Sequence, residues 1–251
     1  MIEKVKILLR KKLKKYQEFH AITKQESFLR NNPTSSILPK GRTTIYYKEY
    51  PRLDKIVLPD PHPYNKTIFS VLSQRKSTQG FSKKQLTLEE ISNLLFYSAG
   101  ERNSSEPHFS RRFYPSAGAL YPLEIYILSL NTELSQGTYH YNVKSHSLEI
   151  LSQKILSFKE SIFNYKWIFT AAMFIVMTGV FQRNVIKYGD RGYRHILVEA
   201  GHVAQNFYLN AAAENIAISS IGGYRDDDLN KMLDVDGIEE SAIYVLAIGS
   251  F

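Results

Sequence analysis

Residues 112–126 read RFYPSAGALYPLEIY and form the most informative stretch of this 251-residue chain. Ser116, Ala117 and Gly118 are small residues that lie between two prolines and are flanked by aromatic residues. Small side chains allow a flat ligand to approach the backbone closely, so this segment is a candidate binding loop. The same pattern also fits a plain tight turn before a strand. The apolar run at residues 123–130 predicts that strand.

A second candidate lies upstream, where residues 74–81 read QRKSTQGF directly after a short predicted helix. Arg75 can hold a phosphate by forked hydrogen bonds, Lys76 by its charge and Ser77 by its hydroxyl group. The composition alone fits a solvated basic loop equally well.

A third candidate is the pair Gly222-Gly223, which follows an apolar run at residues 216–221. Paired glycines at the end of a strand permit a turn whose bare N–H groups can face a ring.

Apolar periodicity predicts both helices and strands along the chain. Thr87 and Glu90 form a capping box that starts one of the helices. The wide apolar stripe at 194–215 indicates a helix buried in a core or a dimer interface. Predicted strands lie at 123–130, 138–141, 147–151, 171–181, 216–221 and 241–248, and predicted helices at 67–75, 87–98, 154–164, 194–215 and 226–233.

The excess of basic over acidic residues is confined to the N-terminal part. Residues 1–60 hold 14 Lys and Arg against 6 Asp and Glu, whereas residues 61–251 are balanced. A nucleic-acid-binding core would carry its own basic face, so we expect no nucleic-acid partner. We predict a basic N-terminal helix and extended arm at 1–63, and one domain at 64–251. The helix, at about 1–28, is expected to dock on its own domain, on an acidic partner or peptide, or on a membrane surface.

Several classes of protein are excluded. The chain has no Cys, which removes Cys-ligated metals and thiol catalysis, and the seven His show no standard ligand spacing, so we expect no metal site. No G-x-S-x-G motif supplies a hydrolase nucleophile. No apolar run is long enough for a membrane helix and no signal peptide is evident, so we expect a cytoplasmic protein.

Taken together, the stretches at 74–81, 112–126 and 222–223 resemble in type and order those of the nitroreductase superfamily, whose members bind FMN at a dimer interface. Residues 112–126, 187–194 (KYGDRGYR) and 199–206 (EAGHVAQN) resemble in particular the SagB/ThcOx-type dehydrogenases. The resemblance runs from about residue 70 to residue 249. It implies an α+β, nitroreductase-like FMN-binding fold, in which helices flank a central mixed sheet, and an intertwined homodimer.

The resemblance also implies which residues bind FMN. The basic stretch would contact the FMN phosphate and ribityl chain, the small-residue loop would pack at the flavin of the other subunit, and the paired glycines would turn over the isoalloxazine ring. A basic residue is usual where this chain has Gln79, which can still donate a hydrogen bond. The implied cofactor-binding residues are Arg75, Lys76, Ser77, Gln79, Ser116, Ala117, Gly118, Gly222 and Gly223.

The implied activity is oxidation of a peptide ring. A partner cyclodehydratase converts Cys, Ser or Thr of a precursor peptide to thiazoline or oxazoline, and the flavoenzyme oxidises this ring to thiazole or oxazole. Lys187 and Tyr188 match a pair associated with removal of the ring proton, with Lys187 as the base and Tyr188 orienting it or relaying the proton.

Two other functions stay open. The chain could be a different flavin oxidoreductase on this fold, acting on nitro compounds, quinones or dehydrated residues of a peptide. It could also be a flavin-free assembly subunit, an alternative that Gln79 keeps open.

Overall fold

The computed structural model describes residues 14–24, 47–102, 111–154 and 165–251. The predicted helix at 154–164 and most of the one at 1–28 lie outside these ranges. Within them, a seven-stranded sheet has the order β1-β6-β5-β4-β7-β9-β8. Its strands are β1 (Lys55–Val57), β4 (Leu123–Ser129), β5 (Gly137–Asn142), β6 (Ser147–Ser152), β7 (Met173–Val180), β8 (Ile216–Ile221) and β9 (Glu240–Ser250).

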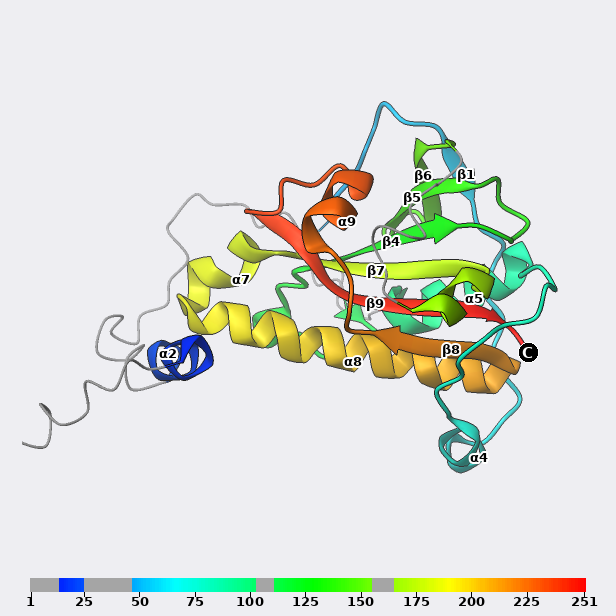
Figure 1. Ribbon diagram of the computed structural model, residues 1–251, viewed down its shortest axis with the longest axis horizontal. Coiled ribbons are helices and arrows are strands. Elements are labelled where there is room, and N and C mark those ends of the chain that lie inside the picture. Colours follow the sequence, from blue (N-terminus) through cyan, green and yellow to red (C-terminus); the bar gives the residue numbers. More distant parts are fainter. Residues whose placement is uncertain (1–13, 25–46, 103–110, 155–164) are drawn as a thin grey trace, which may run out of the picture.

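Helices cover the sheet, and a small second sheet pairs β2 (Glu101–Arg102) with β3 (Arg111–Arg112). Figure 1 shows α8 running along the molecule, with α7 and α2 near one end and α4 beyond the other. The helices are α2 (Lys15–Ile22), α4 (Ile68–Gln74), α5 (Leu88–Ala99), α7 (Phe181–Tyr188), α8 (Arg191–Glu214) and α9 (Asp226–Leu233), with 3₁₀-helices η1 (Ala117–Ala119) and η2 (Lys166–Thr170).

The α+β class is confirmed, and the sheet differs from the prediction in one respect. Every strand pairing in the described part of this sheet is antiparallel, whereas we expected a mixed sheet. The reason is the position of β9, which lies between β7 and β8 and is antiparallel to both. β7 and β8 therefore run in the same direction without being neighbours.

Both faces of the sheet are buried, which explains the almost continuous apolar sequence of its central strands. In β4, Ile125 and Ile127 pack into the core beneath α5 and α8, while Tyr126 and Leu128 face the second core, to which α9 and η2 contribute. The alternation has the period of two that a strand requires.

The register between β4 and β7 positions the candidate site. Leu123 pairs with Gly179, and the N–H of Val180 donates to the carbonyl of Pro122 at 2.8 Å. Because the two strands are antiparallel, the chain before β4 lies beside the chain after β7. The small-residue loop therefore meets α7.

Most elements lie where the pattern predicts them, but α7, β1, β2, β3 and the two 3₁₀-helices were not predicted. The helix α7 follows β7 directly, where no element was predicted, and its neighbour α8 begins three residues earlier than expected. Gly192 permits this arrangement, since a Cβ there would lie 2.8 Å from backbone atoms of Asn184. The strand β1 comes from the segment expected as an arm, where it pairs with β6 at the sheet edge. The division of the chain at residue 63 stays a prediction.

Candidate functional site

The small-residue loop before β4 has an unusual backbone. Gly118 has φ +66°, and two non-glycine residues, Ala119 and Tyr121, have φ +53° and +45°. L-residues disfavour this left-handed region by about 1–2 kcal/mol each, so other contacts must hold the loop. One such contact is internal, because the N–H of Tyr121 donates to Ser116 Oγ at 2.9 Å.

The pair Lys187 and Tyr188 lies directly over this loop. A Cβ on Gly118 would lie 2.6 Å from Tyr188 Oη and 2.8 Å from Lys187 Nζ, so only a glycine leaves both side chains in place. Lys187 Nζ also lies 5.3 Å from the centre of the Tyr188 ring. The structure thus brings together five of the residues expected to act at the cofactor or substrate, namely Ser116, Ala117, Gly118, Lys187 and Tyr188.

Beneath the loop lies a buried acid that was not among the expected site residues. Ser116 Oγ donates to Glu199 Oε2 at 2.6 Å, and Glu199 is only 2% exposed. Burial raises the pKa of Glu199 to about 7, although the Ser116 hydrogen bond and the charges of Arg112 and Arg183 act in the opposite direction. The carboxyl group can therefore gain or lose a proton near neutral pH.

Glu199 could have been noticed in the sequence. It lies three residues after Ile196 and four before Val203, within the apolar stripe of α8. A charged residue inside such a stripe is either an exposed interruption of the pattern or a buried carboxylate. Because Glu199 is buried, it is the second of these.

The basic stretch after α4 contacts the other end of α8. The Arg75 guanidinium lies 5.5 Å from the centre of the Tyr208 ring, and Ser77 Oγ lies 3.1 Å from Tyr208 Oη. The N–H of Thr78 donates to the carbonyl of Ile218 at 2.9 Å, which ties the stretch to β8. Lys76 lies over the ring of the C-terminal Phe251 at 4.4 Å, and Gln79 is exposed.

The paired glycines lie at the end of β8. A Cβ on Gly222 would meet no atom of the described residues within 4 Å, while one on Gly223 would lie 3.2 Å from the Tyr165 ring. Gly222 is exposed, so the backbone here is open to a ligand.

The predicted residues fall into two groups along α8. Glu199 lies under the first group and Tyr208 beside the second, a separation of about 14 Å along the helix axis at 1.5 Å per residue. Figure 1 shows α7, which carries Lys187 and Tyr188, and α4, which precedes Arg75, at opposite ends of α8. A single chain does not place the two groups against one another.

Two cavities contain predicted residues. A cavity of about 840 Å³ lies at the small-residue loop and is lined by Ser116, Gly118, Tyr121 and the cations Arg102 and Arg111, among others. A smaller one, of about 210 Å³, is lined by Lys76, Tyr208 and Phe251 among others.

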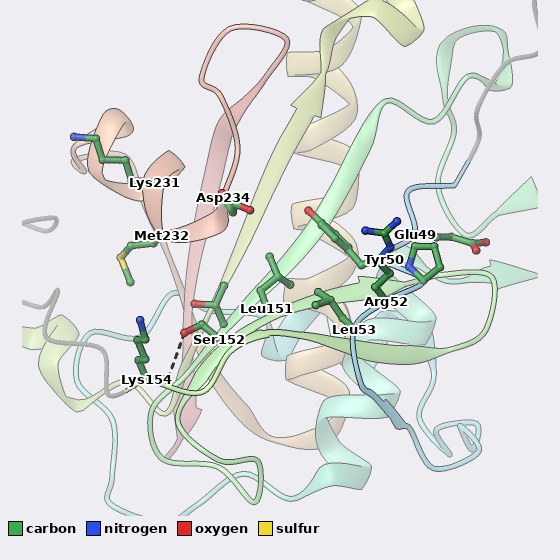
Figure 2. Close-up of a pocket in the computed structure, with 12 residues that line it drawn as sticks. Glu49, Tyr50, Arg52, Leu53, Leu151, Ser152, Lys154, Lys231, Met232 and Asp234 are labelled. Carbon is green, nitrogen blue, oxygen red and sulfur yellow. Dashed lines mark hydrogen bonds between the residues drawn. The ribbon is translucent and has the colours of Figure 1, made fainter.

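A third cavity, of about 630 Å³, contains none of them. Figure 2 shows it between the segment at 49–53, the ends of β5 and β6, and α9, with Tyr50, Leu53 and Leu151 on its apolar side.

The donor set of the first two sites fits FMN. Within the described ranges, no carboxylate lies within ion-pair distance of Arg75 or Lys76, so both cations are available to a phosphate. The open backbone at Gly222 leaves room for a flat ring. In the described part of the chain, no helix is long and apolar enough to cross a membrane.

Comparison with known proteins agrees with this geometry. The model of the nitroreductase family matches residues 72–250. A nitroreductase-like protein of Methanocaldococcus jannaschii is 31% identical over 71% of this chain and 88% of its own length. The microcin B17-processing protein McbC of Escherichia coli is 33% identical over 61% of this chain, and the match spans 58% of McbC.

A solved structure is also similar to this chain in fold and in sequence. The E. coli microcin synthetase McbBCD complex, with truncated pro-MccB17 bound, contains a chain that aligns with a TM-score of 0.57 and 26% identity. The alignment covers 94% of this chain and 94% of that one. Since the family model and the M. jannaschii relative both span most of the chain, this protein belongs to the nitroreductase family.

Proposed function

We propose that this protein is an FMN-dependent dehydrogenase that oxidises thiazoline or oxazoline rings of a modified precursor peptide to thiazoles or oxazoles. Membership of the nitroreductase family indicates a flavin-dependent oxidoreductase. The finer assignment is supported by one observation above all, the position of Lys187 Nζ and Tyr188 Oη against Gly118. The similarity to a microcin-processing protein favours a peptide substrate.

A base is what separates this reaction from simple flavin reductions. Aromatising an azoline removes two electrons and two protons, and FMN, when bound, supplies the two-electron acceptor. A nitro or quinone reductase takes no proton from a substrate carbon. The family fold alone would not require an amine beside the small-residue loop, so the Lys-Tyr pair favours the azoline reaction.

Each side chain then has a defined role. Lys187 Nζ accepts the proton from the ring carbon next to the peptide carbonyl. Tyr188 Oη, close to the same point above Gly118, orients the amine or relays the proton. Arg75, Lys76 and Ser77 hold the cofactor phosphate, with Gln79 as a neutral donor in place of a cation. Gly222 and Gly223 leave the ring face uncovered.

The separation of the two groups along α8 supports a shared site. If two chains pack about α8, the Gly118 loop of one can face the phosphate-binding stretch of the other. The site would then be complete only in a homodimer. We further propose that a cyclodehydratase supplies the azoline substrate, as the reaction requires a ring that this chain does not form.

The test separates proton removal from cofactor binding. Lys187→Ala should retain FMN, judged by its visible spectrum, and should slow azoline oxidation by about 10²–10⁴-fold. Tyr188→Phe, which keeps the ring, should retain FMN and lose less activity. Reduction of a nitroaromatic by NAD(P)H, where it occurs, should change little in both variants.

Equal losses of both activities in Lys187→Ala would mean that the lysine is structural. A purified wild-type protein that stays colourless after incubation with FMN would leave the flavin-free alternative in place of the proposed function.

A further inference from the structure

A chain of buried charges crosses the sheet from the N-terminal segment to the candidate site. Glu149 on β6 is fully buried, His140 lies next to it on β5, and Glu124 on β4 lies on the other side of His140. His140 Nδ1 lies 2.8 Å from Glu149 Oε2, and His140 Nε2 lies 3.0 Å from Glu124 Oε2.

The two carboxylates that flank His140 favour its imidazolium form. The charges of Arg183 and His140 outweigh the effect of burial and lower the pKa of Glu124 to about 2, and hydrogen bonds from His140 and Asn142 do the same for Glu149. Ionised carboxylates only accept hydrogen bonds, so both ring nitrogens of His140 must carry hydrogen. Burial alone would lower the pKa of His140, but its bonds to both acids raise it.

From Glu124, the chain of buried charges continues through Arg183 to the loop of the candidate site. Arg183 on α7 forms an ion pair with Glu124 Oε1 at 2.6 Å and donates to the carbonyl of Tyr121 at 2.9 Å. Tyr121 is the last of the positive-φ residues in this loop, and its N–H bonds to Ser116. Strained residues persist only where surrounding contacts determine their conformation, and Arg183 supplies such a contact.

At its other end, Glu149, the chain of buried charges is bonded to β1 and to the segment before it. The N–H of Tyr50 donates to Glu149 Oε1 at 3.1 Å, and Lys55 Nζ pairs with the same oxygen at 3.0 Å. The Tyr50 ring packs edge-on against His140, with the ring centres 5.2 Å apart. Tyr50 also lines the cavity of Figure 2, so this end of the chain is accessible from the surface.

We infer that His140 is a positioning residue for the candidate site. It holds Glu124, and through Glu124 it holds Arg183 and the carbonyl of Tyr121. The conformation of the Ser116–Tyr121 loop therefore depends on a charge on β5, the third strand from the β1 edge of the sheet. The docking of Tyr50 and Lys55 on Glu149 completes this arrangement. Its consequence for azoline oxidation rests on the proposed function, whereas its consequence for the loop does not.

Hydrogen exchange of the loop tests the inference without the reaction. In His140→Gln, amides in peptides covering 116–123 should exchange about tenfold faster than in a control of equal thermal stability, because the loop opens more often. Ile150→Ala can serve as that control once its melting temperature is shown to match that of His140→Gln, since Ile150 on β6 packs against the core beneath α5 and α8 and has no part in the chain of charges. Equal exchange in the two variants at 116–123 would overturn the inference.

Two further measurements cover a His140→Gln protein that does not fold. Glu149→Gln keeps the side-chain volume and removes only the outer charge, so it should raise loop exchange in the same direction. In the wild-type protein, nitrogen-15 NMR should show His140 protonated on both nitrogens at pH 7.5, and a neutral ring would contradict the inference.

Azoline oxidation by the FMN-loaded variants separates the two proposals. Faster loop exchange with a lower turnover supports both. Faster exchange with unchanged turnover supports the positioning role and contradicts the placement of the reaction at this loop. Lower turnover without faster exchange contradicts the positioning role.

Discussion

Gly118 is the residue on which the candidate site depends most directly. Its positive φ and the two side-chain ends above it impose separate requirements, one on the backbone and one on the space over Cα. Alanine violates both. The amine of Lys187 and the hydroxyl of Tyr188 are flexible chain ends, so they would move aside before the backbone did.

Gly118→Ala should therefore lower both the stability of the protein and its rate of azoline oxidation. We expect a loss of stability of about 1–2 kcal/mol from the left-handed backbone, and a turnover loss of about tenfold or more from displacement of Lys187. Urea unfolding and steady-state kinetics measure the two effects. Gly237→Ala is the control, because Gly237 also has a positive φ, of +72°, but lies in the turn between α9 and β9, outside the candidate site. A Gly118→Ala protein with normal turnover would remove the contact from the proposed mechanism.

Glu199 gives the candidate site a pH dependence whose sign follows from its pKa. The carboxyl group titrates near 7 when folded and near 4.5 when unfolded, so the folded state binds more protons between these values. Stability contributed by this group is therefore present below about pH 4.5 and is lost as the pH rises to 7.

Glu199→Gln should remove the loss of stability that ionisation of Glu199 causes as the pH rises. The variant should gain stability relative to wild type as the pH rises from 5 to 8, by on the order of 2–3 kcal/mol at most. Chemical unfolding at several pH values measures the difference. If the difference between the two proteins were constant over this range, Glu199 would not titrate there.

The sequence predicted single residues well where their effect is local. Thr87 accepts from the N–H of Glu90, and Glu90 accepts from the N–H of Thr87, as the capping box required. The partners of His140 were beyond reach, because Glu124 and Glu149 meet it only through the register of three strands.

Elements with a strong pattern and a clear stop were predicted to the residue. The strand Ile216–Ile221 and the helix Asp226–Leu233 are confirmed without shift. The helix α7 was missed because FQRNVIKY is short and half of its residues are polar, and because Phe181 extended the apolar run of β7. Its helical form follows from packing on α8, which a local pattern does not contain.

The helix α2 docks on the start of α8, close in sequence to the Lys-Tyr pair at the end of α7. Arg191 donates to the carbonyl of Thr23 at 2.8 Å, and Arg194 donates to Thr23 Oγ1 and to the carbonyl of His20. Phe19 packs edge-on against Tyr193, with ring centres 5.7 Å apart. This contact agrees with the first of our three expectations for the N-terminal helix.

Arg194→Ala should release α2 while the domain stays folded. The loss of bonds from a charged donor should cost about 1 kcal/mol or more locally, and chymotrypsin should cleave at Tyr16 and Phe19 about fivefold faster. Mass spectrometry of the released peptides gives the rate. Arg225→Ala serves as the control, because its exposed ion pair with Asp228 is local to α9. Unchanged cleavage in Arg194→Ala would mean that other contacts hold the helix.

At the scale of the whole molecule, the sequence identified the pieces of the site and could not assemble them. The loop at Gly118 and the pair at Lys187 meet only because Leu123 pairs with Gly179, a contact between distant parts of the chain. The basic stretch at Arg75 lies near the far end of α8. Their separation within one chain is what makes the homodimer a physical requirement of the proposed function.

The exposed face of α8 is where such a dimer would form. Val198 is 53% exposed and Leu197 39%, on a helix whose opposite side is buried in the core. Two apolar side chains on a long helix, beside the open surface at Gly201, suit close packing against a second copy.

Val198→Glu should therefore produce a monomer that no longer retains FMN. A carboxylate buried without a partner costs several kcal/mol at an interface, and two copies of it would face each other across a two-fold axis. Light scattering after gel filtration gives the mass, and the visible spectrum gives the flavin content. Val57→Glu is the matched control, since Val57 is 77% exposed on β1, at the edge of the sheet opposite β8. The control should remain a yellow dimer. If Val198→Glu also remained a dimer with full flavin content, the two halves of the site would have to meet across some other surface, and the proposed arrangement of Gly118 and Arg75 about α8 would be wrong.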